Sequence, residues 1–339
     1  MRPVAMAVNR TAAQRPAPLH TIFITLEVMK RIGLSRETLL DGTGISPSDV
    51  ERPNAMVTHA QEMVLFANAL KATGNSAIGL HIGNEIPVTA YGLRAHAMLV
   101  SPTLGDAMRL AFEHPLLGIS YFRMKLLVDG EVARIIVGGY TYRHDLLVIN
   151  TDMCFTAIRR QIIDLTGMSP NFTRIGFTFS RPSHADSYSE YFSCPAIFES
   201  EVNFLEFDAS ILRTKLPLAH PIEYEVAKKA CEKREFELAH WMPTDLVGQL
   251  LCLMYENPIC QDVVEFADRL GMSLRSLQRK LKDMGTSFSA LQDIVGQDIA
   301  SKYLAERHYT AKEIAARLGY KNASAFSRAM RRWSQVTID

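Results

Sequence analysis

The chain has 339 residues, which is enough for two domains of ordinary size. Apolar residues make up 47% of it and charged residues 22%, a balance that excludes a mainly disordered or collagenous protein. The 37 Lys and Arg residues nearly cancel the 36 Asp and Glu residues, so the net charge of +1 indicates neither a nucleic acid nor a membrane as partner.

The first residues carry Pro3, Pro16 and Pro18 but show no apolar period, so we expect residues 1–20 to form a flexible tail. The chain has no signal-peptide core and no run of about 18 apolar residues. We therefore expect a cytoplasmic protein with no membrane partner.

Helical periodicity dominates the first third of the chain. Three segments, residues 23–33, 58–74 and 103–114, have apolar residues three or four positions apart and polar residues near their starts. The pattern changes at Ile119, where two apolar runs flank Asp129-Gly130, a dipeptide typical of a two-residue hairpin turn. A helix over about residues 144–165, ending before Gly167, and strands at FTRIGFTFS and VNFLEF complete an α+β N-terminal domain over residues 21–215.

A charged helical stretch and then an all-helical region follow. We expect residues 216–243 to form a linker helix region and residues 244–339 to form an all-α domain. The N-terminal α+β domain and this all-α domain define a multidomain fold.

The all-helical region contains an internal repeat. EFADRLGM at residues 265–272 and EIAARLGY at residues 313–320 share Glu, Ala, Arg, Leu and Gly at matching positions. Each copy predicts a short helix, a small Ala that lets a second helix approach, and a Gly suited to a left-handed turn. This is the pattern of a helix-turn-helix, expected at about residues 262–284 and 311–333.

The helix after each turn has one apolar face and one polar, basic face. Ser273 and Asn322 are suitable N-caps for these helices, since their side-chain oxygens can accept backbone N–H groups. Arg, Gln and Ser side chains on the outer faces can pair with base edges. The outer residues are Arg275, Gln278, Arg279 and Lys282 in the first unit and Ser324, Ser327, Arg328 and Arg331 in the second.

The spacing between the two units and their charge both suit binding to one DNA site. Residues 288–307 form a 20-residue helical stretch, which spans about 30 Å, close to the roughly 34 Å between successive major grooves. Between Arg269 and Asp339, 13 basic residues stand against six acidic ones. Double-stranded DNA is therefore the expected partner, with Lys280, Lys282, Arg331 and Arg332 contacting phosphates.

A polar and aromatic cluster marks the N-terminal domain. It comprises Arg94, His96, Tyr121, Arg123 and Tyr140, with Tyr142 and Arg143 nearby. If Tyr121 and Arg123 share one strand face, the cluster can form a pocket for an anionic or amphipathic effector. The alternative interpretation is a set of solvent-facing hairpin residues.

These motifs resemble a known family. EFADRLGMSLRSLQRKLKDMGTSF and AERHYTAKEIAARLGYKNASAFSRAMRRW are similar to the DNA-binding domain of AraC/XylS transcription regulators. AYGLRAHAMLVSPTLGDAMRLAFEH and CPAIFESEVNFLEFDASILRTKLPLAHP resemble the arabinose-binding-like ligand and dimerisation domain of one branch of that family.

The resemblance implies a DNA-binding regulator controlled by a small-molecule effector, working as a homodimer. It favours an activator that contacts RNA polymerase. It places the base-reading positions at Arg275, Gln278, Arg279, Ala323, Ser324, Ser327 and Arg328, and adds Ser273 and Asn322 to the phosphate contacts.

Two departures from the family pattern affect the second unit. Gly296 stands in the joining helix where the family usually has Arg, and Gly there costs about 1 kcal/mol of helix stability relative to Ala. Gln335 and Ile338 stand where the family usually has Gly and Pro. We expect a joining helix that bends at Gly296 and a shortened brace for the second unit.

Other functions find little support in the sequence. The ten histidines lack metal-ligand spacing, and no nucleophile elbow, P-loop or dinucleotide fingerprint stands between a strand and a helix. We expect no catalytic residues, no metal and no cofactor. Two alternatives stay open: a small-molecule-binding enzyme with a vestigial DNA-binding module, and a helical module that binds another protein.

Overall fold

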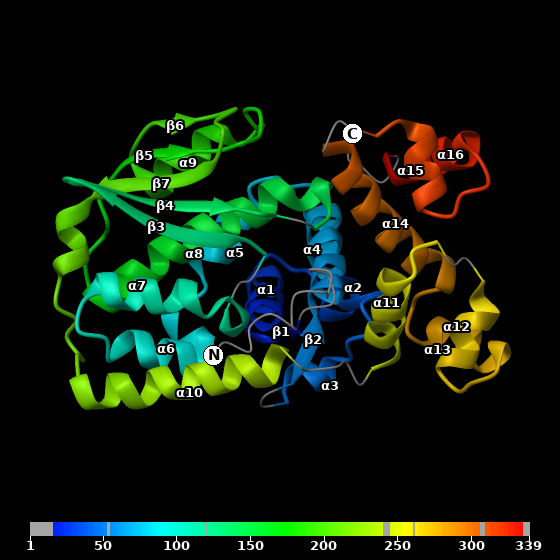
Figure 1. Ribbon diagram of the computed structural model, residues 1–339, viewed down its shortest axis with the longest axis horizontal. Helices are drawn as coiled ribbons and strands as arrows, with labels where there is room; N and C mark the ends of the chain where they lie inside the picture. Colours follow the sequence, from blue (N-terminus) through cyan, green and yellow to red (C-terminus); the bar gives the residue numbers. More distant parts are fainter. Residues whose placement is uncertain are drawn as a thin grey trace.

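The computed structural model describes residues 16–52, 55–118, 121–140, 142–239, 245–259, 262–305 and 309–334. It has an α+β part and an all-helical part, as the sequence predicts, and the helical part lies beyond the end of the sheet (Figure 1). The expected tail lies outside the described residues as far as residue 15. Pro16–Pro18 then forms strand β1, antiparallel to β2 at Met56–Thr58.

Helices build most of the first third, and the three helices predicted there are present as α1, α4 and α7. The α-helices of this region are α1 (His20–Arg31), α2 (Arg36–Leu40), α3 (Pro47–Val50), α4 (His59–Thr73), α5 (Ile78–Asn84), α6 (Gly92–Leu99) and α7 (Leu104–Glu113). Short 3-10 turns lie at η4 (Val88–Tyr91) and η5 (Pro115–Leu117). Thr58 and Thr103 cap α4 and α7 by accepting backbone N–H groups, which explains where these two helices begin.

The sheet has five strands in the order β3-β4-β7-β5-β6. Its strands are β3 (Arg123–Asp129), β4 (Val132–Gly138), β5 (Phe172–Gly176), β6 (Ala196–Ile197) and β7 (Asn203–Asp208). All neighbours are antiparallel except β5 and β6, so the sheet is mixed. The predicted hairpin is confirmed, since Asp129 pairs with Val132 and Gly130 has a φ of 58°.

Helix α8 (Leu147–Thr166), preceded by the turn η6 (His144–Leu146), is the long helix predicted from the sequence, and Gly167 ends it in the left-handed conformation. Its partner is α5, whose two glycines permit an unusually close approach. A Cβ atom at Gly79 or Gly83 would collide with the carbonyl oxygen of Ile149 or Met153. Two turns and a short helix, η7 (Ala185–Ser187), α9 (Tyr188–Phe192) and η8 (Ala209–Arg213), complete this part.

Helix α10 (Pro221–Ala239) is the charged helix expected in the linker region, and it packs along α6 and η5. His114 Nδ1 lies 2.6 Å from Glu235 Oε2, and His96 Nε2 lies 2.9 Å from Glu223 Oε1. Two pairs on α10 therefore hold it against the N-terminal helices. In the described part of the chain, no helix is long and apolar enough to cross a membrane.

The C-terminal part consists of six helices among the described residues. They are α11 (Leu246–Glu256), α12 (Val263–Arg269), α13 (Leu274–Asp283), α14 (Phe288–Ala305), α15 (Ala311–Arg317) and α16 (Ala323–Ser334). Helix α14 separates the pair α12–α13 from the pair α15–α16 (Figure 1). The two helix pairs predicted from the internal repeat are thus present, one near each end of a long helix.

Candidate DNA interface and effector domain

The first helix-turn-helix unit consists of α12, a turn at Gly271 and α13. Gly271 has a φ of 66°, the left-handed conformation that the repeat predicts. Ser273 caps α13 by accepting the backbone N–H of Ser276 at 3.2 Å. Leu277 and Leu281 are buried, so one face of α13 is fixed against its neighbours and the other is left for solvent.

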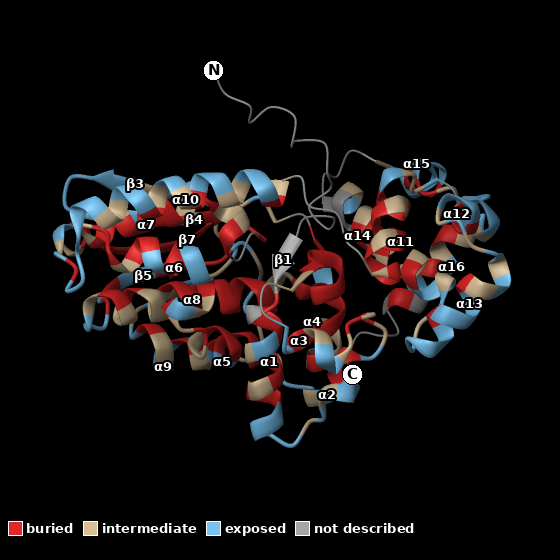
Figure 2. Ribbon diagram, turned by 90° about the horizontal axis from the view of Figure 1, so that it is seen from below, coloured by how far each residue is buried: buried red, intermediate tan, exposed pale blue. Residues whose placement is uncertain are grey.

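The outer face of α13 carries the basic side chains predicted to meet DNA. Figure 2 shows exposed residues along α13. They include Arg275, Gln278, Arg279, Lys280 and Lys282, and Ser273 at the start of the helix is exposed as well. Within the described chain, none of the four basic residues of this set forms an ion pair. Free guanidinium and ammonium groups on a rigid helix suit the binding of base edges and phosphates.

The second unit repeats this construction with α15, Gly319 and α16. Thr310 and Glu313 form a capping box at the start of α15, and Gly319 has a φ of 70°. Asn322 Oδ1 accepts the backbone N–H of Ala325 at 2.8 Å, which is the cap predicted for α16. The buried face of α16 includes Phe326.

The outer face of α16 is less charged than that of α13. Asn322, Ser324, Arg328 and Arg331 are exposed, whereas Ala323 and Ser327 are half-buried. The side chain of Arg332 lies outside the described part of the structure. The roles of these residues in reading bases or binding phosphates stay predictions.

Gly296 has a packing role in the joining helix. A Cβ atom there would lie 3.1 Å from Trp333 Cζ2, so a larger residue would push the indole ring of α16 away from α14. Trp333 Nε1 also donates a hydrogen bond to Asp293 Oδ1 at 3.0 Å. Helix α14 runs unbroken through Gly296 from Phe288 to Ala305, so the glycine permits close packing within a continuous helix.

The two units are anchored differently. The buried residues of the first, Phe266 and Leu277 among them, belong to the same apolar core as the N-terminal domain. Those of the second, including Ile314, Phe326 and Trp333, form a separate small core. Gln61 of α4 donates a hydrogen bond to Asp245 at the start of α11 at 2.9 Å, which adds a polar link on the N-terminal side.

Two of the five predicted effector residues lie near α6 in different environments. Arg94 is buried, with its guanidinium carbon 4.3 Å from the ring centroid of Tyr91. His96 is half-exposed and pairs with Glu223 of α10. These two side chains do not meet in one site.

The other three effector candidates lie around the first hairpin strand. Tyr121 is buried against the rings of His59 and Tyr142, whereas Arg123, two residues later, is exposed. The expectation that Tyr121 and Arg123 share a strand face is wrong, because β3 begins only at Arg123 and Tyr121 precedes the pleat. Tyr140 lies at the same open end of the hairpin, two residues after Gly138, which pairs with Arg123, and it donates a hydrogen bond to the backbone oxygen of Arg143. An effector role for the five residues stays a prediction.

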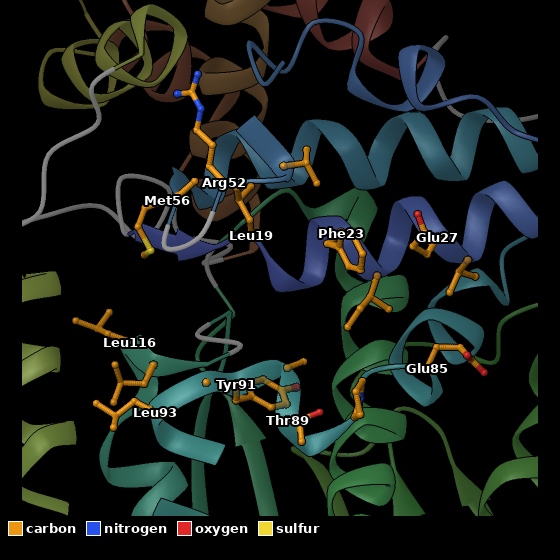
Figure 3. A pocket seen from close by; sticks show the side chains of 18 of the residues that line it. Leu19, Phe23, Glu27, Arg52, Met56, Glu85, Thr89, Tyr91, Leu93 and Leu116 are labelled. Atoms are coloured by element: carbon orange, nitrogen blue, oxygen red, sulfur yellow. The ribbon is translucent and has the colours of Figure 1, made fainter. Parts of the chain in front are cut away.

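A cavity of about 730 Å³ lies elsewhere in the N-terminal domain, between α1, the segment from η4 to α6, and α10 (Figure 3). None of the five effector candidates lines it. Its walls come from segments that are distant in sequence, and its apolar residues are indistinguishable by pattern from ordinary core residues. Within the described residues, no group of three or more His, Cys, Asp or Glu is placed to hold a metal ion.

Comparisons with known families match both parts of the chain. Residues 33–216 match the arabinose-binding domain of AraC transcription regulators, N-terminal, and residues 266–339 match a helix-turn-helix domain. The first match alone covers more than half of the chain.

Two relatives agree with these matches over most of the chain. The ornithine utilization regulator of Pseudomonas aeruginosa is 27% identical over 312 residues, 91% of each chain. An uncharacterized HTH-type transcriptional regulator of Mycobacterium tuberculosis is 24% identical over 341 residues, 94% of each chain. The crystal structure of the transcriptional regulator CdpR from Pseudomonas aeruginosa aligns with a TM-score of 0.44 and 21% identity, covering 81% of this chain and 89% of that one.

These matches also decide between the classes of function that the sequence left open. The family consists of transcription regulators and not of enzymes, so the interpretation as an enzyme with a vestigial DNA-binding module falls away. The chain belongs to the AraC family of DNA-binding transcription regulators, with a ligand-binding domain of the arabinose-binding type followed by a helix-turn-helix domain.

Proposed function

We propose that this protein is an effector-controlled transcription activator that inserts α13 and α16 into two successive major grooves of one DNA site. The observation that carries the proposal is the outer face of α13, where Arg275, Arg279, Lys280 and Lys282 are exposed and unpaired within the described chain. Four uncompensated cations on one side of a short helix would repel each other, and a polyanion relieves that repulsion.

The length of α14 supports binding in two grooves. Its 18 residues rise about 27 Å, somewhat less than the roughly 34 Å between successive major grooves. The helix-turn-helix pairs at its two ends add the remaining reach. One copy of the chain would then cover about 20 base pairs.

We assign base discrimination to Arg275, Gln278 and Arg279 in the first unit and to Ala323, Ser324, Ser327 and Arg328 in the second. Phosphate contacts fall to Ser273, Lys280, Lys282, Asn322, Arg331 and Arg332. The first unit contributes most of the specificity, because its outer face carries the larger number of exposed side chains able to form bidentate pairs with bases.

Three further parts of the proposal concern partners. The N-terminal domain binds a small-molecule effector, two copies associate through this domain, and the DNA-bound dimer recruits RNA polymerase to activate transcription. Because its target is DNA, the protein works in the cytoplasm of a bacterium. A helical module that binds only another protein is the competing function, and the experiment below separates the two.

Substitution Arg279→Ala tests the proposal on a DNA site selected from a random pool by the wild-type protein. We expect a loss of about 1–3 kcal/mol in binding this site, with relaxed preference at one base position and a much smaller effect on random DNA. Fluorescence anisotropy over a range of salt concentrations measures both affinities.

Lys125→Ala is the matched control, since Lys125 is an exposed basic residue on β3, away from both helix-turn-helix units. It should leave binding unchanged. Equal losses on selected and random DNA would remove Arg279 from the base-reading set. The protein-binding module would be favoured by two results together: the protein protects no DNA region of about 20 base pairs, and it captures another protein at an affinity that does not depend on salt.

A further inference from the structure

The cavity in the N-terminal domain has opposed apolar walls. Phe23 of α1 projects from one side, and Tyr91 and Leu93 from the other (Figure 3). Phe23 is 44% exposed and Leu93 is 36% exposed, although most large apolar side chains of this domain are buried. Exposing these apolar side chains to water costs free energy, and an apolar ligand that covered them would remove this cost.

The size of the cavity fits a small molecule. Its volume of about 730 Å³ lies within the usual range for ligand pockets, roughly 300–1,000 Å³. Aromatic rings on both walls, Phe23 and Tyr91, favour a flat or aromatic guest. The guanidinium carbon of Arg94 lies 4.3 Å from the centroid of the Tyr91 ring and packs against this wall.

Positive charge predominates among the ionisable side chains that line the cavity, because Arg31, Arg52 and Arg234 outnumber Glu27 and Glu85. Glu27 pairs with Arg36 at 2.9 Å, and Glu85 pairs with Arg31, itself a lining residue, at 2.8 Å. Arg234 of α10 also lines the cavity, and its partner Glu237 lies outside the lining. That pair joins two half-exposed side chains three residues apart on one helix, which is a weak attachment.

A buried cation adds to this potential. Arg94 is 2% exposed, its Nε has no hydrogen-bond acceptor in the described chain, and no described carboxylate forms an ion pair with it. Burial lowers its pKa, and Glu235, which partly offsets this, is already engaged by His114. The wall formed by Tyr91 thus has a buried positive charge behind it, which donates a hydrogen bond to the backbone oxygen of Ala111 but has no ion-pair partner among the described residues.

We propose that this cavity is the effector site and that it binds a small amphipathic anion, with an aromatic body between Phe23 and Tyr91 and a carboxylate at Arg234. The inference rests on the proposed function and names the site and the chemical class of its effector. Arg52 also lines the cavity, but its side chain points away from it in Figure 3 and is not part of the proposed site.

The position of the site offers a physical connection to the DNA-binding part. Helix α1 lines the cavity, and its Thr21 donates a hydrogen bond to Glu62 of α4. One residue earlier on α4, Gln61 binds Asp245 at the start of α11. A ligand that fixes α1 therefore bears on α11, the first helix of the C-terminal part, through one buried and one part-buried polar contact.

The test uses the full chain and three probes that differ only in the polar group: 4-phenylbutyrate, 4-phenylbutanol and 4-phenylbutylamine. Isothermal titration calorimetry measures each dissociation constant. We expect the carboxylate to bind at least tenfold more tightly than the alcohol, and the amine to bind most weakly. Equal affinity for all three, or no binding of the carboxylate, would overturn the proposal.

Two variants locate the bound probe. Phe23→Gln should weaken 4-phenylbutyrate binding about tenfold, whereas Met168→Gln, at a 48% exposed Met outside the cavity, should not change it. Arg234→Gln should reduce the preference for the carboxylate over the alcohol and leave alcohol binding intact. Binding that Phe23→Gln does not alter would place the probe elsewhere and contradict the assignment.

Failure of this inference is distinguishable from failure of the proposed function. Binding of the selected DNA site is measured on the same preparation without any probe. Specific DNA binding with no probe in the cavity would refute only the effector site. Probe binding without specific DNA binding would instead refute the proposed sequence-specific binding of DNA.

Discussion

At the scale of single residues, Glu206 shows how tertiary contacts set a charge state. Its carboxylate, on β7, accepts hydrogen bonds from Arg174 of β5 at 2.8 Å and from Arg134 of β4 at 2.6 Å. The hydrogen bond from Arg174, reinforced by Arg134 and Thr173, lowers the pKa of Glu206 from 4.5 to about 2 against the effect of burial. Three neighbouring strands are thus joined by one side chain.

The sign of the pH dependence follows from the lowered pKa. A carboxylate that binds its proton more weakly in the folded state stabilises the fold above pH 4.5, and this contribution disappears as the pH falls from 4.5 to about 2. We expect Glu206→Gln to lower the free energy of unfolding at pH 7 by about 1–3 kcal/mol, since both arginines are half-exposed. In urea titrations between pH 2 and 7, the free energy of unfolding of the variant should decrease less on acidification than that of the wild-type protein.

Arg181→Gln provides the control for this measurement. Arg181 pairs with Asp186, but the two side chains are 62% and 96% exposed, so the pair is screened by water. Its loss should change stability by less than about 0.5 kcal/mol. An equal effect of both substitutions would show that burial of Glu206 does not matter.

At the scale of elements, α10 has one covered face and one exposed face that carries large apolar side chains. Ala227, Cys231 and Leu238 are buried against the N-terminal domain. Ile222, Val226 and Phe236 are 75%, 56% and 55% exposed. At 100° per residue the exposed three fall within an arc of about 80°, which they share with the exposed Lys229 and Lys233. We therefore place the proposed dimer contact on α10.

The double variant Ile222→Asp/Val226→Asp tests this contact. Two like charges on the facing helices would repel, so we expect the dimer dissociation constant to rise at least tenfold, because burying a carboxylate without a partner is costly. Light scattering coupled to size-exclusion chromatography measures the mass. Val128→Asp, at a 54% exposed position on the edge strand β3, is the matched control. If Val128→Asp dissociated the dimer and the α10 variant did not, the dimer interface would have to be assigned to the β3–β4 hairpin.

At the scale of the whole molecule, the two helix-turn-helix units differ in what supports them. The core of the first is continuous with that of the N-terminal domain, whereas the second has its own core of seven buried residues. A core that small stabilises a structure only marginally. We expect the second unit to unfold at a lower temperature than the rest of the chain.

Two substitutions distinguish the unfolding of the second unit from the unfolding of the rest of the chain. Phe326→Ala removes a 3% exposed ring from the second core, and should abolish the low-temperature transition in differential scanning calorimetry while leaving the main one in place. Phe266→Ala removes a 1% exposed ring from the shared core, and should lower the main transition. A single transition that responds equally to both would show that the chain unfolds as one unit.

Local features of the chain were predictable. The hairpin at Asp129-Gly130, the left-handed glycines at 271 and 319, and the caps Ser273 and Asn322 all depend on neighbours within a few residues. Helical periodicity likewise predicts the exposed basic face of α13, because the opposite face must be buried. The DNA-binding class follows from these local features together with the repeat.

Long-range features were not predictable in the same way. The sequence by itself determined the two-part organisation, the paired helix-turn-helix units and their charge, since each is encoded in periodicity over short windows. Only the tertiary structure decided that Tyr121 is buried while Arg123 is exposed, that Gly296 makes room for Trp333, and that a cavity opens between α1, α6 and α10. Each of these depends on contacts between segments far apart along the chain, and no local pattern records which segments become neighbours.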